Sequence, residues 1–172
     1  MNIPCVDIPE GTSGDWRVQR FHVSESEASL HNIRCSFQAG MGRRTIKPGQ
    51  YTKLTCQNHT VMSDTDAEKW DHYFAVQNAT GAILINGLGI GMVLNACLLK
   101  PEVELAFVVE KNADVITLVA PHYRAKFGSR VEIIHDDALT FKPKSGIRFG
   151  RCWCRLFLAA IAHSGFSERR AL

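Results

Sequence analysis

The sequence has 172 residues, of which 45% are hydrophobic and 22% are charged. This composition is that of an ordinary globular domain, long enough to bury a core without a metal or disulfide staple. No apolar run approaches the roughly 18 residues of a membrane span. The N-terminus lacks the pattern of a secretory signal. A net charge of +3 indicates no nucleic-acid face. We therefore expect a soluble, cytoplasmic chain.

The N-terminal third predicts a small β-rich appendage, assigned to residues 1–64. Alternating or β-branched stretches predict its strands, and polar or glycine-rich stretches predict the connections between them. In chain order these are an irregular lead-in at 1–14, a strand at 16–23, a Gly- and Arg-rich loop at 39–49 and a hairpin of strands 51–56 and 60–62 around Gln57-Asn58-His59.

A helix is predicted over 65–78. Thr65-Asp66-Ala67-Glu68 fits a capping box, in which the hydroxyl and the carboxylate satisfy free amides at the start of a helix. The aromatic side chains that follow fall on one side of this helix, and we expect that side to pack against the main sheet. Its members are Trp70, Tyr73, Phe74 and Gln77.

A strand, a glycine turn and a helix then follow in direct succession. Residues 82–85 are a continuous apolar run, typical of a strand buried on both faces of a parallel sheet, and residues 92–99 are strong helix formers. Between them lies Gly87-Leu88-Gly89-Ile90-Gly91. Glycine lets a backbone turn tightly and approach a bound nucleoside, while the helix start offers free amides.

Two further strands are predicted to end on acidic residues. The apolar strand 105–109 ends on Glu110, 23 residues after Gly87, which is the spacing of a carboxylate that binds ribose hydroxyls. Strand 131–135 leads into Asp136-Asp137-Ala138. Because ligands of open α/β sheets bind at the carboxyl ends of strands, we predict a Rossmann-like, mostly parallel α/β domain over 65–149 with one nucleoside crevice.

The segments 83–91, 108–115 and 134–138 resemble the first three motifs of class I S-adenosylmethionine-dependent methyltransferases, especially the spermidine-synthase-like branch of phage and bacteria. The resemblance covers about residues 60–141. It implies S-adenosylmethionine as cofactor, with the glycine loop beside the methionine part, Glu110 on the ribose, Asp137 on the adenine amino group and Ala138 beside the base. The predicted cofactor-binding residues are Gly87, Leu88, Gly89, Gly91, Glu110, Lys111, Asp136, Asp137 and Ala138.

Three other functions stay open at this point. The hairpin and acidic helix start also resemble aminopropyltransferases, but Trp70-Asp71-His72 stands where that family has Tyr-His-Glu, and its downstream Asp-Ser/Thr-x-Asp-Pro motif is missing. A non-catalytic S-adenosylmethionine-binding remnant is the second. NAD-dependent reduction is the least favoured, because the loop lacks the third glycine at the dinucleotide spacing.

The tail at 150–172 departs from the expected pattern. No fourth strand with an acidic end follows Asp137, so the catalytic half is expected to be missing, and we assign neither a catalytic residue nor a methyl acceptor. A frameshift after about residue 149 and an authentic helix at 156–163 are equal alternatives. A truncated sheet would leave an edge for the tail or a homo-oligomer partner to cover.

Metal binding is not predicted. The six cysteines lie at positions 5, 35, 56, 97, 152 and 154 without a zinc-knuckle spacing, and the histidines are scattered. We therefore expect reduced thiols and no metal site.

Overall fold

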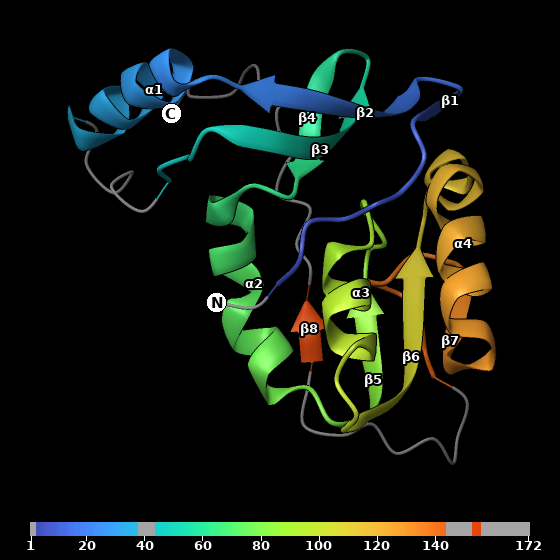
Figure 1. The fold of residues 1–172 in the computed structure, drawn as a ribbon. Coiled ribbons are helices and arrows are strands. Elements are labelled where there is room, and N and C mark those ends of the chain that lie inside the picture. Colours follow the sequence, from blue (N-terminus) through green and yellow to red (C-terminus); the bar gives the residue numbers. More distant parts are fainter. Residues whose placement is uncertain (1–2, 38–43, 144–152, 156–172) are drawn as a thin grey trace, which may run out of the picture.

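The computed structural model describes residues 3–37, 44–143 and 153–155. These ranges form two four-stranded sheets and four α-helices (Figure 1). One sheet is antiparallel and comes from the N-terminal part of the chain, and the other is parallel. The described helices are all too short or too polar to cross a membrane.

The antiparallel sheet has the strand order β1-β2-β3-β4. Its strands are β1 (Gly11–Ser13), β2 (Trp16–Val23), β3 (Gly49–Cys56) and β4 (His59–Ser63). The predicted strand at 16–23 and the predicted hairpin are confirmed. Gln57 and Asn58 both have positive φ, 48° and 67°, as a two-residue turn between right-twisted strands requires.

Helix α1 (Glu25–Phe37) joins β2 to β3 and was not predicted. It begins with a reciprocal capping box, in which Ser24 Oγ accepts from Glu27 N at 3.3 Å and Glu27 Oε2 accepts from Ser24 N at 2.8 Å. Ser24-x-x-Glu27 is therefore a sequence signal that would have located this helix.

Helix α2 (Asp66–Asn78) begins one residue after the predicted start and ends at the predicted residue, but two expectations about it were wrong. The Thr65 side chain makes no cap bond, because its hydroxyl lies 3.1 Å from the Ser63 hydroxyl instead. The predicted inward face points outward: Trp70 is 46% exposed and Phe74 is 79% exposed. Lys69 and Val76 are buried in its place, so the aromatic residues pack on each other rather than on the sheet.

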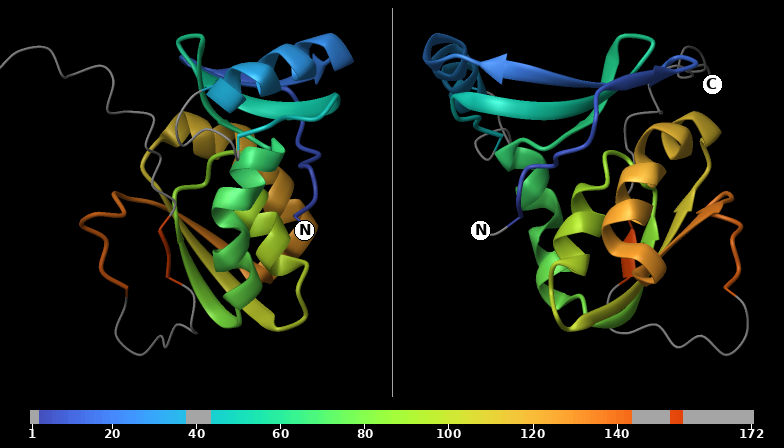
Figure 2. Two further views of the ribbon diagram at one scale, coloured as in Figure 1. Left: turned by 90° about the vertical axis from the view of Figure 1, so that its left-hand side faces the viewer. Right: turned by 45° about the vertical axis from the view of Figure 1, so that its right-hand side comes forward.

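The parallel sheet has the strand order β7-β6-β5-β8, as in a Rossmann-like fold, so the predicted fold class is confirmed. Its strands are β5 (Gly81–Asn86), β6 (Val103–Glu110), β7 (Val131–His135) and β8 (Trp153–Arg155). Helices α2, α3 (Met92–Leu98) and α4 (Ala113–Phe127) cover one face, and the short 3₁₀ helix η1 (Gly128–Arg130) leads into β7 (Figure 2).

Strand β8 shows that the tail adds a short fourth strand to the parallel sheet. Three residues pair parallel to β5, with Leu84, Ile85 and Asn86 opposite residues 153–155. The backbone can therefore add to this edge of the sheet although the sequence carries no acidic strand end there. The proposed helix at 156–163 lies outside the described residues.

The two sheets share one core. Trp16, Leu54 and Met62 from the antiparallel sheet belong to the same buried cluster as Ile83 and Ile90. Figures 1 and 2 show the antiparallel sheet lying across the carboxyl ends of the parallel strands. The N-terminal sheet therefore covers the edge of the parallel sheet at which a ligand of an open α/β fold binds.

A fully buried carboxylate fixes the lead-in segment against this sheet. Asp64 is 0% exposed, and its side chain accepts hydrogen bonds from Val6 N at 3.0 Å and from Thr52 N at 2.7 Å. A buried charge is tolerated when donors surround it in this way. The N-terminal segment is thereby held in place across the junction of the two sheets.

Candidate functional site

Three strand ends meet at the carboxyl edge of the parallel sheet. Gly87 N donates to the Val109 carbonyl at 2.7 Å, and Asp136 N donates to the Glu110 carbonyl at 3.1 Å. These bonds continue the β5–β6 and β6–β7 pairings just past the strands. The glycine turn, Glu110 and the aspartate pair are thus brought side by side, as their positions in the sequence predicted.

The glycine loop has a backbone that other residues adopt only under strain. Gly89 has φ +53° and Gly91 has φ +72°, which favours glycine strongly. Space is also restricted, since a Cβ on Gly89 would collide with Met62 Sδ and a Cβ on Gly91 would collide with the ring of Tyr123. These two glycines allow the loop to lie against its neighbours with no side chain between.

Glu110 holds the loop and the next helix together. It is 3% exposed; its Oε2 accepts from Leu88 N at 2.8 Å and its Oε1 accepts from Asn112 N at 2.9 Å. Each carboxylate oxygen can accept two hydrogen bonds, so one lone pair on each oxygen stays free for a ligand hydroxyl. The carboxylate therefore both fixes the site and can bind a polar ligand in it.

Helix α4 begins at the same place. Asn112 is its N-cap, and Asn112 Oδ1 accepts from Asp114 N at 2.9 Å and from Val115 N at 3.3 Å. The backbone N–H of Asn112 thus donates to Glu110, while the side chain of Asn112 caps the helix. The start of α4 is consequently fixed in position relative to the glycine loop.

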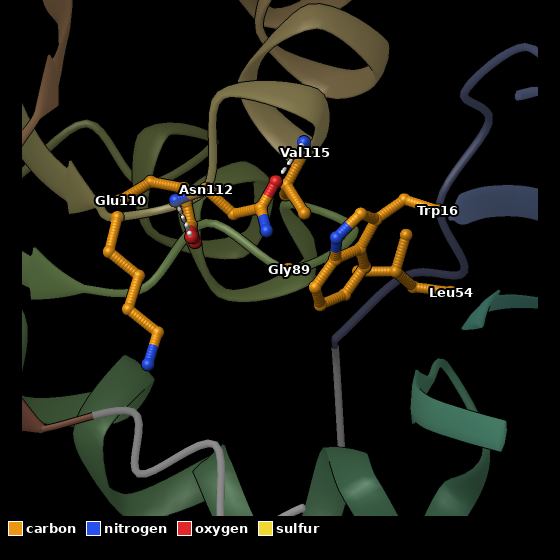
Figure 3. A pocket seen from close by; sticks show the side chains of 7 residues that line it. Trp16, Leu54, Gly89, Glu110, Asn112 and Val115 are labelled. Atoms are coloured by element: carbon orange, nitrogen blue, oxygen red, sulfur yellow. Dashed lines mark hydrogen bonds between the residues drawn. The ribbon is translucent and has the colours of Figure 1, made fainter. Parts of the chain in front are cut away.

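A small pocket with room for about one water molecule lies at this junction (Figure 3). Its lining comes from both sheets and consists of Trp16, Leu54, Gly89, Glu110, Lys111, Asn112 and Val115. This space is far smaller than the roughly 300–1,000 Å³ of sites for small organic ligands. The indole of Trp16 and the side chain of Leu54 close the pocket on the side opposite Glu110 (Figure 3).

Trp16 and Leu54 were not among the predicted site residues. Their two strands, β2 and β3, were predicted, but nothing in the alternation of either strand indicates which end of the parallel sheet it will cover. Only the packing of the antiparallel sheet against the parallel one brings them to the glycine loop.

The remaining predicted residues do not line this pocket. Asp137 is exposed, and its Oδ1 accepts from Leu139 N at 2.8 Å, while Asp136 Oδ1 accepts from Asp137 N at 2.7 Å. Ala138 packs with the apolar cluster on the opposite sheet face. Of the nine predicted residues, Gly89, Glu110 and Lys111 line the pocket, and the ligand roles of all nine stay predictions.

Two titratable side chains of α2 have shifted pKa values. Burial raises the pKa of Glu68, with Asp71 adding to this rise, while Arg44 opposes it. Burial also lowers the pKa of His72, against the opposing effect of Asp71. The fold therefore favours the neutral form of both side chains.

We expect the His72 shift to make folding stability depend on pH. Because the folded-state pKa is lowered, the unfolded chain binds more protons as the pH falls below the ordinary histidine value of about 6.5, and stability is lost in that range. Urea unfolding at pH 7.5 and 5.5 should show a steeper loss for the native chain than for His72→Gln. A variant at the exposed His59, His59→Gln, is the control; equal losses in all three would contradict this expectation.

In the described ranges, no group of three His, Cys, Asp or Glu side chains is placed to hold a metal ion. Cys5, Cys35, Cys56 and Cys97 are in no disulfide there.

Comparison with known proteins gives structural neighbours only. No family model and no curated protein sequence matches the chain. The spermidine synthase of Thermotoga maritima is 18% identical, with a TM-score of 0.40 over 76% of this chain and 40% of that chain. A spermidine synthase in complex with the transition-state analogue AdoDATO is 20% identical, with a TM-score of 0.40 over 75% of this chain and 39% of that chain. The chain thus spans about two fifths of the length of these structures.

Proposed function

We propose that this chain binds an S-adenosylmethionine-type nucleoside and acts as an S-adenosylmethionine-dependent methyltransferase on an acceptor that is not assigned. The observation that carries the proposal is the convergence of three features at one edge of the parallel sheet. These are the glycine loop, the buried carboxylate of Glu110 and the exposed Asp137. Residues 65–149 would form the nucleoside-binding domain and residues 1–64 its cover.

The residues at this edge fit such a nucleoside chemically. Glu110 lines the pocket, and each of its two oxygens can accept one hydrogen bond besides the backbone bond that it already accepts, which suits the two hydroxyls of a ribose. Asp137 is exposed on the adjoining strand end, where its carboxylate can accept from an exocyclic amino group. When bound, S-adenosylmethionine would supply an alkyl group activated by a positively charged sulfur, and the protein would supply position and orientation.

Two alternatives share the same nucleoside site. An aminopropyltransferase of the spermidine-synthase type would use it for a decarboxylated form of the cofactor, and a non-catalytic binder would retain affinity without turnover. Incubation with each cofactor and a small-molecule cell extract as the source of acceptor, followed by separation of the products, distinguishes methylthioadenosine, formed when an aminopropyl group passes to an amine, from S-adenosylhomocysteine, formed when a methyl group passes to its acceptor. Binding of a cofactor without formation of either product would favour the non-catalytic alternative.

Calorimetry on the native chain is the first test. We expect saturable binding of S-adenosylmethionine and S-adenosylhomocysteine and none of NAD. Asp137→Ala should weaken binding about tenfold or more, because a hydrogen bond to a charged group contributes roughly 1.5–3 kcal/mol. Glu132→Ala, which removes an exposed carboxylate from β7, is the matched control. An absence of binding at millimolar nucleoside would refute the proposal.

A further inference from the structure

Helix α1 has an apolar face that points away from the rest of the protein. Leu30 is 58% exposed, Ile33 is 55% exposed and Phe37 is 86% exposed. Their spacing of three and four residues places them on one side of the helix. The opposite side carries the buried Ala28 and Cys35, so α1 is anchored by one face and exposes a second, apolar face.

The charged side chains of α1 are placed so that two copies of the helix, packed antiparallel, bring opposite charges together. Glu27 lies in the first turn and Arg34 in the last, and their separation of seven residues places both on the same flank of the apolar face. In an antiparallel pair of identical helices the same flanks meet. Glu27 of one copy would then lie near the partner's Arg34, twice in each pair.

We propose that α1 is a homodimer interface, in which the Leu30, Ile33 and Phe37 faces of two copies pack antiparallel about a twofold axis. A closed twofold contact needs one self-complementary patch, which the apolar row and its charged flank provide. Glu27 uses Oε2 for the capping box, so Oε1 stays free for the partner's Arg34. The interface does not depend on the proposed nucleoside function.

A lipid surface is a less suitable partner for this face. Interfacial helices carry many Lys and Arg residues on the polar side. In α1 the first turn contributes two acidic residues, Glu25 and Glu27, and the last turn contributes Arg34 alone. This arrangement favours a protein partner of matching charge pattern over an anionic membrane.

Sedimentation velocity over a concentration series tests the interface on the full chain. We expect the native chain to dimerise, and Ile33→Glu to raise the dimer dissociation constant about 100-fold or more, because two isoleucine side chains leave the interface in each dimer. Phe74→Glu, at another exposed apolar position, on α2, should leave the constant unchanged. A circular dichroism spectrum establishes that each variant is folded.

The charge pairs give a second, independent test. Arg34→Glu should weaken the dimer about tenfold, since it replaces two attractive contacts by repulsive ones, and added salt should weaken the native dimer. In a parallel pair opposite flanks would meet, so Glu27 and Arg34 would not face each other and neither Arg34→Glu nor salt should weaken the dimer in this way. A monomeric native chain, a dimer lost in Phe74→Glu instead, or a monomer that sediments with anionic lipid vesicles would overturn the proposal.

Discussion

Replacing Glu110 by Gln is expected to abolish nucleoside binding and to destabilise the fold at the same time. Both carboxylate oxygens accept from backbone amides, Oε2 from Leu88 and Oε1 from Asn112. A glutamine has one acceptor oxygen, so in either orientation its amide group faces an N–H donor. One buried donor is left unsatisfied, at a cost of about 1–3 kcal/mol. Calorimetric titration and urea unfolding measure the two effects.

A matched control is available on the same strand. Glu104 lies on β6 and is exposed, so Glu104→Gln makes the same chemical change without removing a buried acceptor. It should leave both affinity and unfolding free energy unchanged within about 0.5 kcal/mol. If Glu110→Gln binds S-adenosylmethionine as the native chain does, Glu110 has a structural role alone and the proposed ribose contact is wrong.

Much of the parallel sheet could be predicted because its signals are local. A buried parallel strand is a short apolar run, and a tight turn that needs positive φ selects glycine at fixed positions. Residues 82–85 and 105–109 are such apolar runs, and the loop from Gly87 to Gly91 has glycines at such fixed positions. Since parallel strands align their carboxyl ends, the juxtaposition of Glu110 with Asp136 follows from strand order alone.

The errors arose where tertiary packing decides between similar local patterns. Ser24-x-x-Glu27 forms a capping box and Thr65-x-x-Glu68 does not, although both fit the same pattern. The Thr65 hydroxyl contacts Ser63, and burial favours the neutral form of Glu68. Likewise the aromatic side of α2 was predicted to face the sheet. The position of α2 beside α3 instead buries Val76 and leaves Phe74 exposed.

The pocket itself could not be predicted from one segment. Trp16 and Leu54 reach it from strands β2 and β3, far from Glu110 in sequence. Their positions depend on how the antiparallel sheet lies across the parallel one, a contact made by many residues of the shared core. A prediction based on strand periodicity identifies which side chains are buried, but not which residues they meet.

Replacing Gly91 by Ala is expected to cause the largest loss of stability among these variants. Gly91 has φ +72°, which costs an L-residue about 1 kcal/mol. The added Cβ would also collide with the ring of Tyr123. That ring is 1% exposed, donates its hydroxyl to the Ile90 carbonyl at 2.9 Å and stacks on Phe127, so it cannot move aside without breaking other contacts. We expect about 3 kcal/mol or more in total, within the range for an overpacked core.

Gly81→Ala separates the two causes. Gly81 also has positive φ, +64°, but a Cβ there meets nothing within 4 Å, so this variant should lose only the backbone term of about 1 kcal/mol. Urea unfolding of both variants gives the difference, which measures the collision with Tyr123. Equal losses would show that the ring yields freely, and the glycine loop would then be fixed by its backbone conformation and by Glu110 rather than by close packing on α4.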